Sequence, residues 1–224
     1  MSLNAKAWLG LGFVAALMAL VLSLSAGTLR YWQGWGFLAV FFGASLLITL
    51  DLMKTDPALL ARRVRGGPTA EREPAQRVAM FFASAGFLAL LVVPGLDHRF
   101  GWSFVAAPVV VAGDVLTAVG FYAVYRVFKA NPYASSTVEV AGGQTVVTTG
   151  PYAVVRHPMY AGSMLYLLGM PLALGSYWGL CALAAMMPFL IWRLFDEERL
   201  LLAKLQGYAE YRTRVRWRLV PGLF

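Results

Sequence analysis

The long apolar segments of this chain constrain its fold more than any other feature. A helix needs about 20 mostly apolar residues to cross roughly 30 Å of hydrocarbon. Four segments reach about that length, and two shorter ones near the end are separated only by the turn GSYWG. We therefore predict an all-α integral membrane protein with about six transmembrane helices, the last two forming a helical hairpin, and a cytoplasmic C-terminal helical segment. The six segments are residues 7–26, 35–53, 78–96, 103–128, 159–174 and 177–195.

The composition excludes a soluble domain and argues against nucleic-acid binding. Hydrophobic residues make up 59% of the chain and charged residues only 13%, whereas soluble proteins average about 25% charged. Lys and Arg outnumber Asp and Glu by 19 to 11, but these bases lie between and beyond the apolar segments rather than on one soluble face. We expect them to contact membrane lipids. No protein partner can be inferred from the sequence.

The distribution of the bases predicts the orientation of the spans. Basic residues concentrate in the 54–77 connection and after residue 198, whereas the loops on the other side carry little beyond Arg30 and Arg99. Because basic loops stay on the cytoplasmic side, we expect both termini to be cytoplasmic. The bases on that side are Lys54, Arg62, Arg63, Arg65, Arg72 and Arg77, followed by Arg199, Lys204, Arg212, Arg214, Arg216 and Arg218.

One polar segment interrupts the apolar pattern, with the sequence TTGPYAVVRHPMYAG at residues 148–162. It falls at the predicted cytoplasmic end of the fifth span. Arg156 and His157 offer polar tips, and Pro158 fits the first position of a helix, whose free N–H groups and positive dipole end attract an anion. The segment is therefore a candidate ligand site near the membrane boundary.

A second group of polar and aromatic residues returns to the same membrane face after the last span. Glu197 and Glu198 supply acceptors for an ammonium group, while Tyr160, Tyr208 and Tyr211 supply aromatic faces for a ring or a soft cation. S-adenosylmethionine carries a carboxylate, an ammonium, an adenine and a sulfonium, and would use all of these groups. Each of these groups also has a purely structural explanation: a contact with lipid headgroups, an aromatic residue at the membrane–water interface, or a solvated helix end.

The C-terminal part of the chain resembles a known superfamily of membrane enzymes. From residue 131 to residue 224 it contains, in order, NPYASSTV, VVTTGPYAVVRHPMYAG, LALGSYWGL, DEERLL, GYAEYRTRV and LVPGLF. This pattern resembles the isoprenylcysteine carboxyl methyltransferase and phospholipid methyltransferase superfamily. The resemblance implies an S-adenosylmethionine-dependent methyltransferase with its cofactor-binding core in residues 131–224, and with residues 1–130 forming spans that shape the substrate side.

The resemblance also implies roles for individual residues. His157, Pro158, Tyr160 and Gly162 match its RHPxYxG element, Glu197 and Glu198 match its paired glutamates, and Tyr208, Tyr211 and Arg214 match its tail. We expect the residues of the first two elements, with Arg156, Tyr208 and Tyr211, to form the cofactor site. We expect either Arg193 or Arg214 to orient an anionic acceptor. We also expect His157 and Glu197 to lie at a solvent-reaching face. The acceptor stays open among a prenylcysteine-like carboxylate, a lipid amine and a thiol.

Two alternatives stay open at the level of the sequence. The first is an NADPH-dependent membrane reductase of the sterol-reductase kind, which has a related element but an acidic residue after its glycine. Ser163 follows Gly162 in this chain, which argues against that alternative. The second is a non-catalytic transporter or scaffold, for which Asp114 within the fourth apolar segment is the main candidate residue. No metal site is expected.

Overall fold

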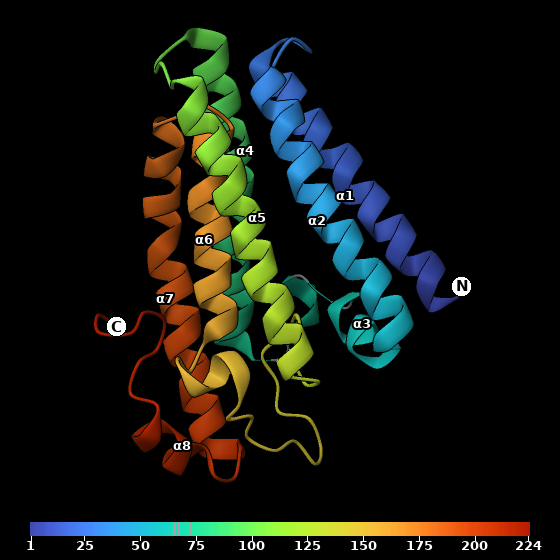
Figure 1. Cartoon of the computed structure of the whole chain (residues 1–224), viewed down its shortest axis with the longest axis vertical. Coiled ribbons are helices and arrows are strands. Elements are labelled where there is room, and N and C mark those ends of the chain that lie inside the picture. Colours follow the sequence, from blue (N-terminus) through green and yellow to red (C-terminus); the bar gives the residue numbers. More distant parts are fainter. Residues whose placement is uncertain (65, 67, 72) are drawn as a thin grey trace.

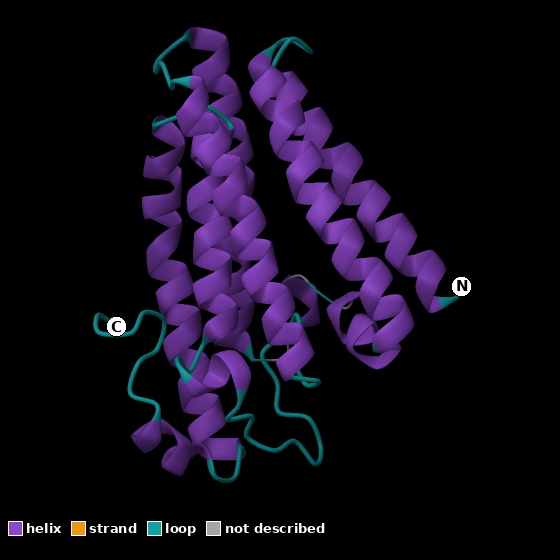
Figure 2. Ribbon diagram, viewed as in Figure 1, coloured by secondary structure: helices purple, strands orange, loops and turns teal. Residues whose placement is uncertain are grey.

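Helices make up all the regular structure in the part of the chain that is described (Figure 2). The structure is a computed structural model and describes residues 1–64, 66, 68–71 and 73–224. The predicted all-α class is therefore confirmed. Of the bases that predicted the orientation, Arg65 and Arg72 lie outside the described residues.

Five of the described helices are long and apolar enough to cross a membrane. A further embedded helix, α6, has 16 residues and spans only about 24 Å at 1.5 Å per residue. This agrees roughly with the predicted six spans. The spanning helices are α1 (Leu3–Ala26), α2 (Trp32–Thr55), α4 (Pro74–Phe100), α5 (Ala107–Ala130) and α7 (Trp178–Lys204), and the shorter elements are α3 (Pro57–Val64), η1 (Pro68–Ala70), η2 (Gly150–Ala153), α6 (Pro158–Ala173) and α8 (Tyr208–Arg214).

The outer surface of the spans is apolar, as a multi-pass membrane protein requires. Large hydrophobic side chains such as Phe13, Leu24, Leu47 and Phe81 are more than half exposed. In water, an exposed apolar surface of this extent marks an interaction site or an aggregation hazard. In a bilayer it faces lipid chains, so the chain is a multi-pass membrane protein.

The short helix α6 is embedded against α5, its main packing partner. A Cβ atom added at Gly169 would lie 2.6 Å from the carbonyl oxygen of Gly113, so only glycine permits this approach of the two backbones. Small residues commonly allow such close packing between membrane helices. The close fit fixes α6, and with it the polar segment at its N-terminus.

The last two predicted spans, α6 and α7, follow one another as predicted, but they do not pack mainly on each other. α6 packs chiefly on α5, and α7 packs chiefly on α4. α7 also continues to Lys204, beyond the predicted end at residue 195, because the helix persists after the apolar run has ended. Gly207 then adopts a φ of 83°, a left-handed conformation that favours glycine, and the chain turns into α8.

The connections at one end of the bundle are tied together by buried hydrogen bonds. The carboxylate of Asp97 accepts hydrogen bonds from the backbone N–H of Ser103 at 2.7 Å and from the hydroxyl of Ser176 at 2.5 Å. Tyr31 donates to the carbonyl oxygen of Leu174 at 2.5 Å. These connections lie at the top of Figure 1, whereas α3, α8 and the 131–157 connection lie toward the opposite end.

Candidate functional site

A cavity of about 450 Å³ lies at the end of the bundle that carries α3 and α8. This volume falls in the range of small-molecule sites. Most of its walls come from the connection at residues 131–147, Tyr152 of η2, the N-terminal end of α6 with the two residues before it, the second half of α7, and α8. The predicted site residues that line it are Arg156, His157, Pro158, Tyr160, Arg193, Glu197, Tyr208 and Tyr211.

The cavity is not formed by residues 131–224 alone. Arg63 from α3, Gly66 from the following connection and Met80 from α4 also line it. The first of these was interpreted from the sequence only as a sign of membrane orientation. The N-terminal part therefore contributes directly to the walls of the cavity.

Glu197 and Tyr160 connect α7 to the first turn of α6. The Tyr160 hydroxyl donates a hydrogen bond to Glu197 Oε2 at 2.7 Å. Among the described residues, no donor reaches the other carboxylate oxygen of Glu197. Because both side chains line the cavity, this oxygen is available to accept hydrogen bonds from a cationic ligand group.

Glu198 does not line the cavity; it is a buried carboxylate, here called a hub, that contacts three basic side chains. Its Oε1 lies 3.1 Å from Arg156 Nε and 3.3 Å from His157 Nε2, and its Oε2 lies 3.0 Å from Arg218 Nε. The backbone N–H of His157 donates to the carbonyl oxygen of Arg218 at 2.9 Å. Glu198 thereby holds the polar segment and the C-terminal segment on α7. The expectation that His157 lies at a solvent-reaching face is wrong, because only 4% of it is exposed.

The two tail tyrosines differ in what their hydroxyl groups contact. Tyr211 donates to the carbonyl oxygen of Tyr152 at 2.8 Å, which fixes the η2 turn. The Tyr208 hydroxyl is buried and has no hydrogen-bond partner among the described residues. Burial raises the pKa of Tyr208, and the nearby carboxylates of Glu198 and Glu197 raise it further, so the group stays a donor. A buried donor without a partner in a cavity wall is a candidate ligand contact.

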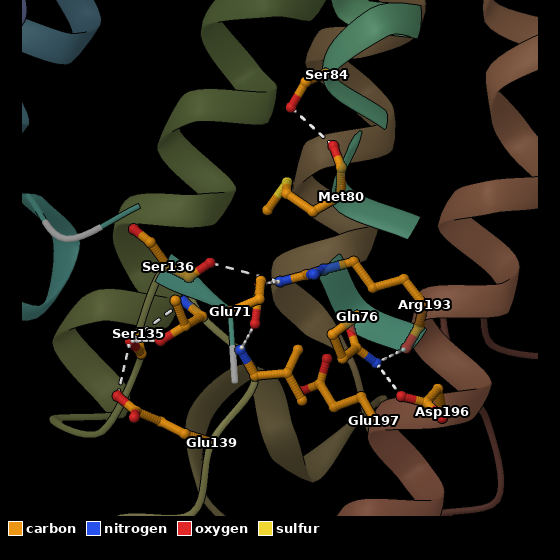
Figure 3. A network of polar contacts seen from close by, with 12 residues as sticks. Glu71, Gln76, Met80, Ser84, Ser135, Ser136, Glu139, Arg193, Asp196 and Glu197 are labelled. Atoms are coloured by element: carbon orange, nitrogen blue, oxygen red, sulfur yellow. Dashed lines mark hydrogen bonds and ion pairs between the residues drawn. The ribbon is translucent and has the colours of Figure 1, made fainter. Parts of the chain in front are cut away.

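Arg193 lies one helical turn before Glu197 and forms a buried ion pair that the sequence did not reveal (Figure 3). Its Nη2 lies 2.6 Å from Glu71 Oε1, and Glu71 Oε2 accepts from the backbone N–H of Val138 at 3.1 Å. Arg193 Nη1 is buried without a partner among the described residues. One face of this guanidinium is therefore held by the protein, and another is left for a ligand.

The start of α4 is fastened to the same part of α7. Gln76 Nε2 donates to the carbonyl oxygen of Arg193 at 3.2 Å and to Asp196 Oδ2 at 2.6 Å (Figure 3). Glu71 and Gln76 are fully or almost fully buried. No local pattern could have identified them, because their partners on α7 lie more than a hundred residues away along the chain.

Besides Glu198, two other predicted site residues lie apart from the cavity, Gly162 and Arg214. Gly162 is buried against α5, where an added Cβ would lie 3.1 Å from the backbone nitrogen of Val124. Arg214 is exposed, with 74% of its side chain accessible, and pairs with Glu210 at 3.8 Å within α8. Close packing against α5 therefore explains why residue 162 is a glycine. The position of Arg214 offers no support for a role in orienting an acceptor.

The fold and this site define a membrane protein whose apolar spans carry a polar small-molecule cavity at one end. Residues 108–207 match the family described as Phospholipid methyltransferase. The resemblance to the integral-membrane methyltransferase superfamily is thereby confirmed for this part of the chain. The match runs from α5 to the end of α7 and includes the polar segment. A search of the curated proteins found no match.

Proposed function

We propose that this protein is an S-adenosylmethionine-dependent methyltransferase that acts on a lipophilic acceptor, and that the cavity between α3, α6, α7 and α8 is its active site. One observation carries the proposal: residues of the polar segment, α7 and the tail, separated along the chain, gather around one cavity, and some of their buried donors have no partner within the described part of the chain. The match to a family of membrane methyltransferases supports it.

The side chains that line the cavity fit the chemistry of this cofactor. Arg193 Nη1 and the Tyr208 hydroxyl would hold the cofactor carboxylate, since both are buried donors that no described residue accepts from. The free oxygen of Glu197 would accept hydrogen bonds from its ammonium group. The tyrosine rings would face its adenine or its sulfonium, since aromatic faces attract soft cations. The Glu198 hub would keep these walls in place.

When bound, S-adenosylmethionine supplies an electrophilic methyl group, whose C–S bond breaks with the electron pair left on sulfur while a bond forms to the acceptor nucleophile. The protein's own contribution is to hold the reacting groups in line and to exclude water. Buried fixed pairs such as Arg193–Glu71 suit this positioning role, because the walls need no reorganisation when ligands arrive.

A lipophilic acceptor fits the place of the cavity in the fold. The cavity lies at the end of the spans, and Met80 and Met159 add apolar walls next to its polar ones. A water-soluble cofactor would enter from the aqueous side, and the acceptor would arrive from the bilayer. Because basic residues concentrate at this end, we place the active site and both termini on the cytoplasmic side.

The test is methyl transfer by the purified protein in detergent with added membrane lipids. Radiolabelled S-adenosylmethionine should transfer label into the organic extract of these lipids. Glu197→Gln should reduce the rate at subsaturating cofactor about tenfold or more, because a charge-assisted hydrogen bond is lost. Arg214→Gln is the matched control, since this exposed residue lies away from the cavity. Label that stays entirely in the aqueous phase would contradict the lipophilic acceptor, and no transfer with any lipid fraction would contradict the activity.

A further inference from the structure

The three arginines that line the cavity differ in how their charges are compensated. Arg193 lies 2.6 Å from Glu71, and Arg156 lies 3.1 Å from Glu198. Arg63 forms no ion pair with any of the described residues. It is therefore the one arginine in the described cavity wall whose positive charge has no carboxylate beside it.

Arg63 is held in place by neutral groups. Its Nη1 donates to the carbonyl oxygen of Ser135 at 2.8 Å and lies 3.9 Å from Met159 Sδ. Its guanidinium lies over the ring of Phe128, with 4.8 Å between the guanidinium carbon and the ring centroid. Desolvation by burial lowers the pKa of Arg63, although an arginine stays protonated in proteins. The charge is thus positioned and partly desolvated, but not neutralised.

The surroundings of Arg63 place it at the apolar side of the cavity. On the same helix, Leu59 and Leu60 are buried in a hydrophobic cluster with Val124 and Phe128, and Met159 packs against this cluster. The tail residues Tyr208, Tyr211 and Leu205 form a separate cluster. Arg63 also lies outside residues 108–207, the part that matches the methyltransferase family. Its position is therefore next to the apolar spans rather than among the tail residues that we assign to the cofactor.

We propose that Arg63 binds an anionic group, a phosphate or a carboxylate, that is attached to the apolar chain of the acceptor. The proposal rests on the proposed function and deepens it by naming Arg63 as the residue that would position the headgroup of an anionic acceptor. A guanidinium suits this task because its planar set of donors matches the oxygens of phosphate and carboxylate. The apolar cluster beside Arg63 would receive the chain, and the charge would fix the depth at which the headgroup enters the cavity.

The test compares ligands that share one chain and differ only in the headgroup. Oleyl phosphate, oleic acid and oleyl alcohol are each titrated against the purified protein in a neutral detergent, with S-adenosylhomocysteine present. We expect the two anions to bind about tenfold to a hundredfold more tightly than the alcohol. Inorganic phosphate alone should not bind measurably, which separates a headgroup from free phosphate. Equal affinity for all three amphiphiles in the wild-type protein would overturn the proposal without any variant.

Two variants then assign the preference to Arg63. Arg63→Gln should abolish the preference for the anions, and Arg63→Lys should keep part of it. Arg62→Gln is the matched control: Arg62 on the same helix donates to the carbonyl oxygen of Pro132 and does not line the cavity, so the preference should persist. A preference that survives Arg63→Gln would refute the assignment.

Titration with S-adenosylhomocysteine alone distinguishes this proposal from the proposed function. Its affinity should be the same in the wild type and in both Arg63 variants. An affinity that falls in Arg63→Gln as much as the amphiphile preference does would assign Arg63 to the cofactor and overturn the proposal. If the wild-type protein does not bind S-adenosylhomocysteine, the proposed function itself fails, whatever the amphiphiles do.

Discussion

Replacing Tyr208 by phenylalanine separates ligand binding from folding. The Tyr208 hydroxyl is buried and unpaired within the described part of the chain, and a buried polar group without a partner costs about 1–3 kcal/mol. Tyr208→Phe should therefore leave the free energy of unfolding of the ligand-free protein unchanged or higher. If the hydroxyl donates to the cofactor carboxylate, its loss costs about 1.5–3 kcal/mol of binding, which is roughly a tenfold to hundredfold weaker affinity.

Tyr211→Phe is the matched control on the same helix. Its hydroxyl donates to the carbonyl oxygen of Tyr152, so its removal should lower the free energy of unfolding by about 1 kcal/mol or more. Both variants are measured by calorimetric titration with S-adenosylhomocysteine and by thermal unfolding without ligand. If Tyr208→Phe loses as much stability as Tyr211→Phe and keeps its affinity, the hydroxyl is a structural group and the assignment is refuted.

Three further substitutions test the parts of the structure that hold the site. Glu71→Ala should lower the free energy of unfolding by about 3–5 kcal/mol, because Arg193 would stay buried without its carboxylate; denaturant unfolding in a fixed detergent measures this loss. His157→Ala should weaken binding of S-adenosylhomocysteine and also reduce thermal stability, since Glu198 loses a buried partner; unchanged stability would show that this contact is dispensable. Gly169→Leu should destabilise the protein by about 1–3 kcal/mol or more through overpacking against α5, and a wild-type unfolding temperature would contradict the tight helix contact.

The sequence predicted the helices well because their signal is local. Apolar runs of about 20 residues have few structural solutions in a membrane, so the class and most spans followed directly. The packing partners did not follow, because an apolar helix shows little difference between its faces. Thus the close contact of α6 with α5, and that of α7 with α4, could not be inferred from the order of the segments along the chain.

The site was predicted only in part, because some of its contacts join residues that lie far apart along the chain. The polar segment and the paired glutamates were recognisable as motifs, and the structure brings most of these residues to one cavity. The motif did not show that Glu197 faces the cavity while the adjacent Glu198 is a buried hub. The motif also could not identify Glu71 or Arg63 as residues of the site, because their roles depend on partners far along the chain.

The central claim is that the cavity between α3, α6, α7 and α8 holds the methyl donor. An experimental structure of the protein with S-adenosylhomocysteine tests this claim most directly. We predict that the ligand occupies this cavity, with its carboxylate contacting Arg193 and Tyr208 and its ammonium group contacting Glu197. A ligand bound elsewhere in the protein, or a cavity that takes up NADPH instead of S-adenosylhomocysteine, would contradict the account.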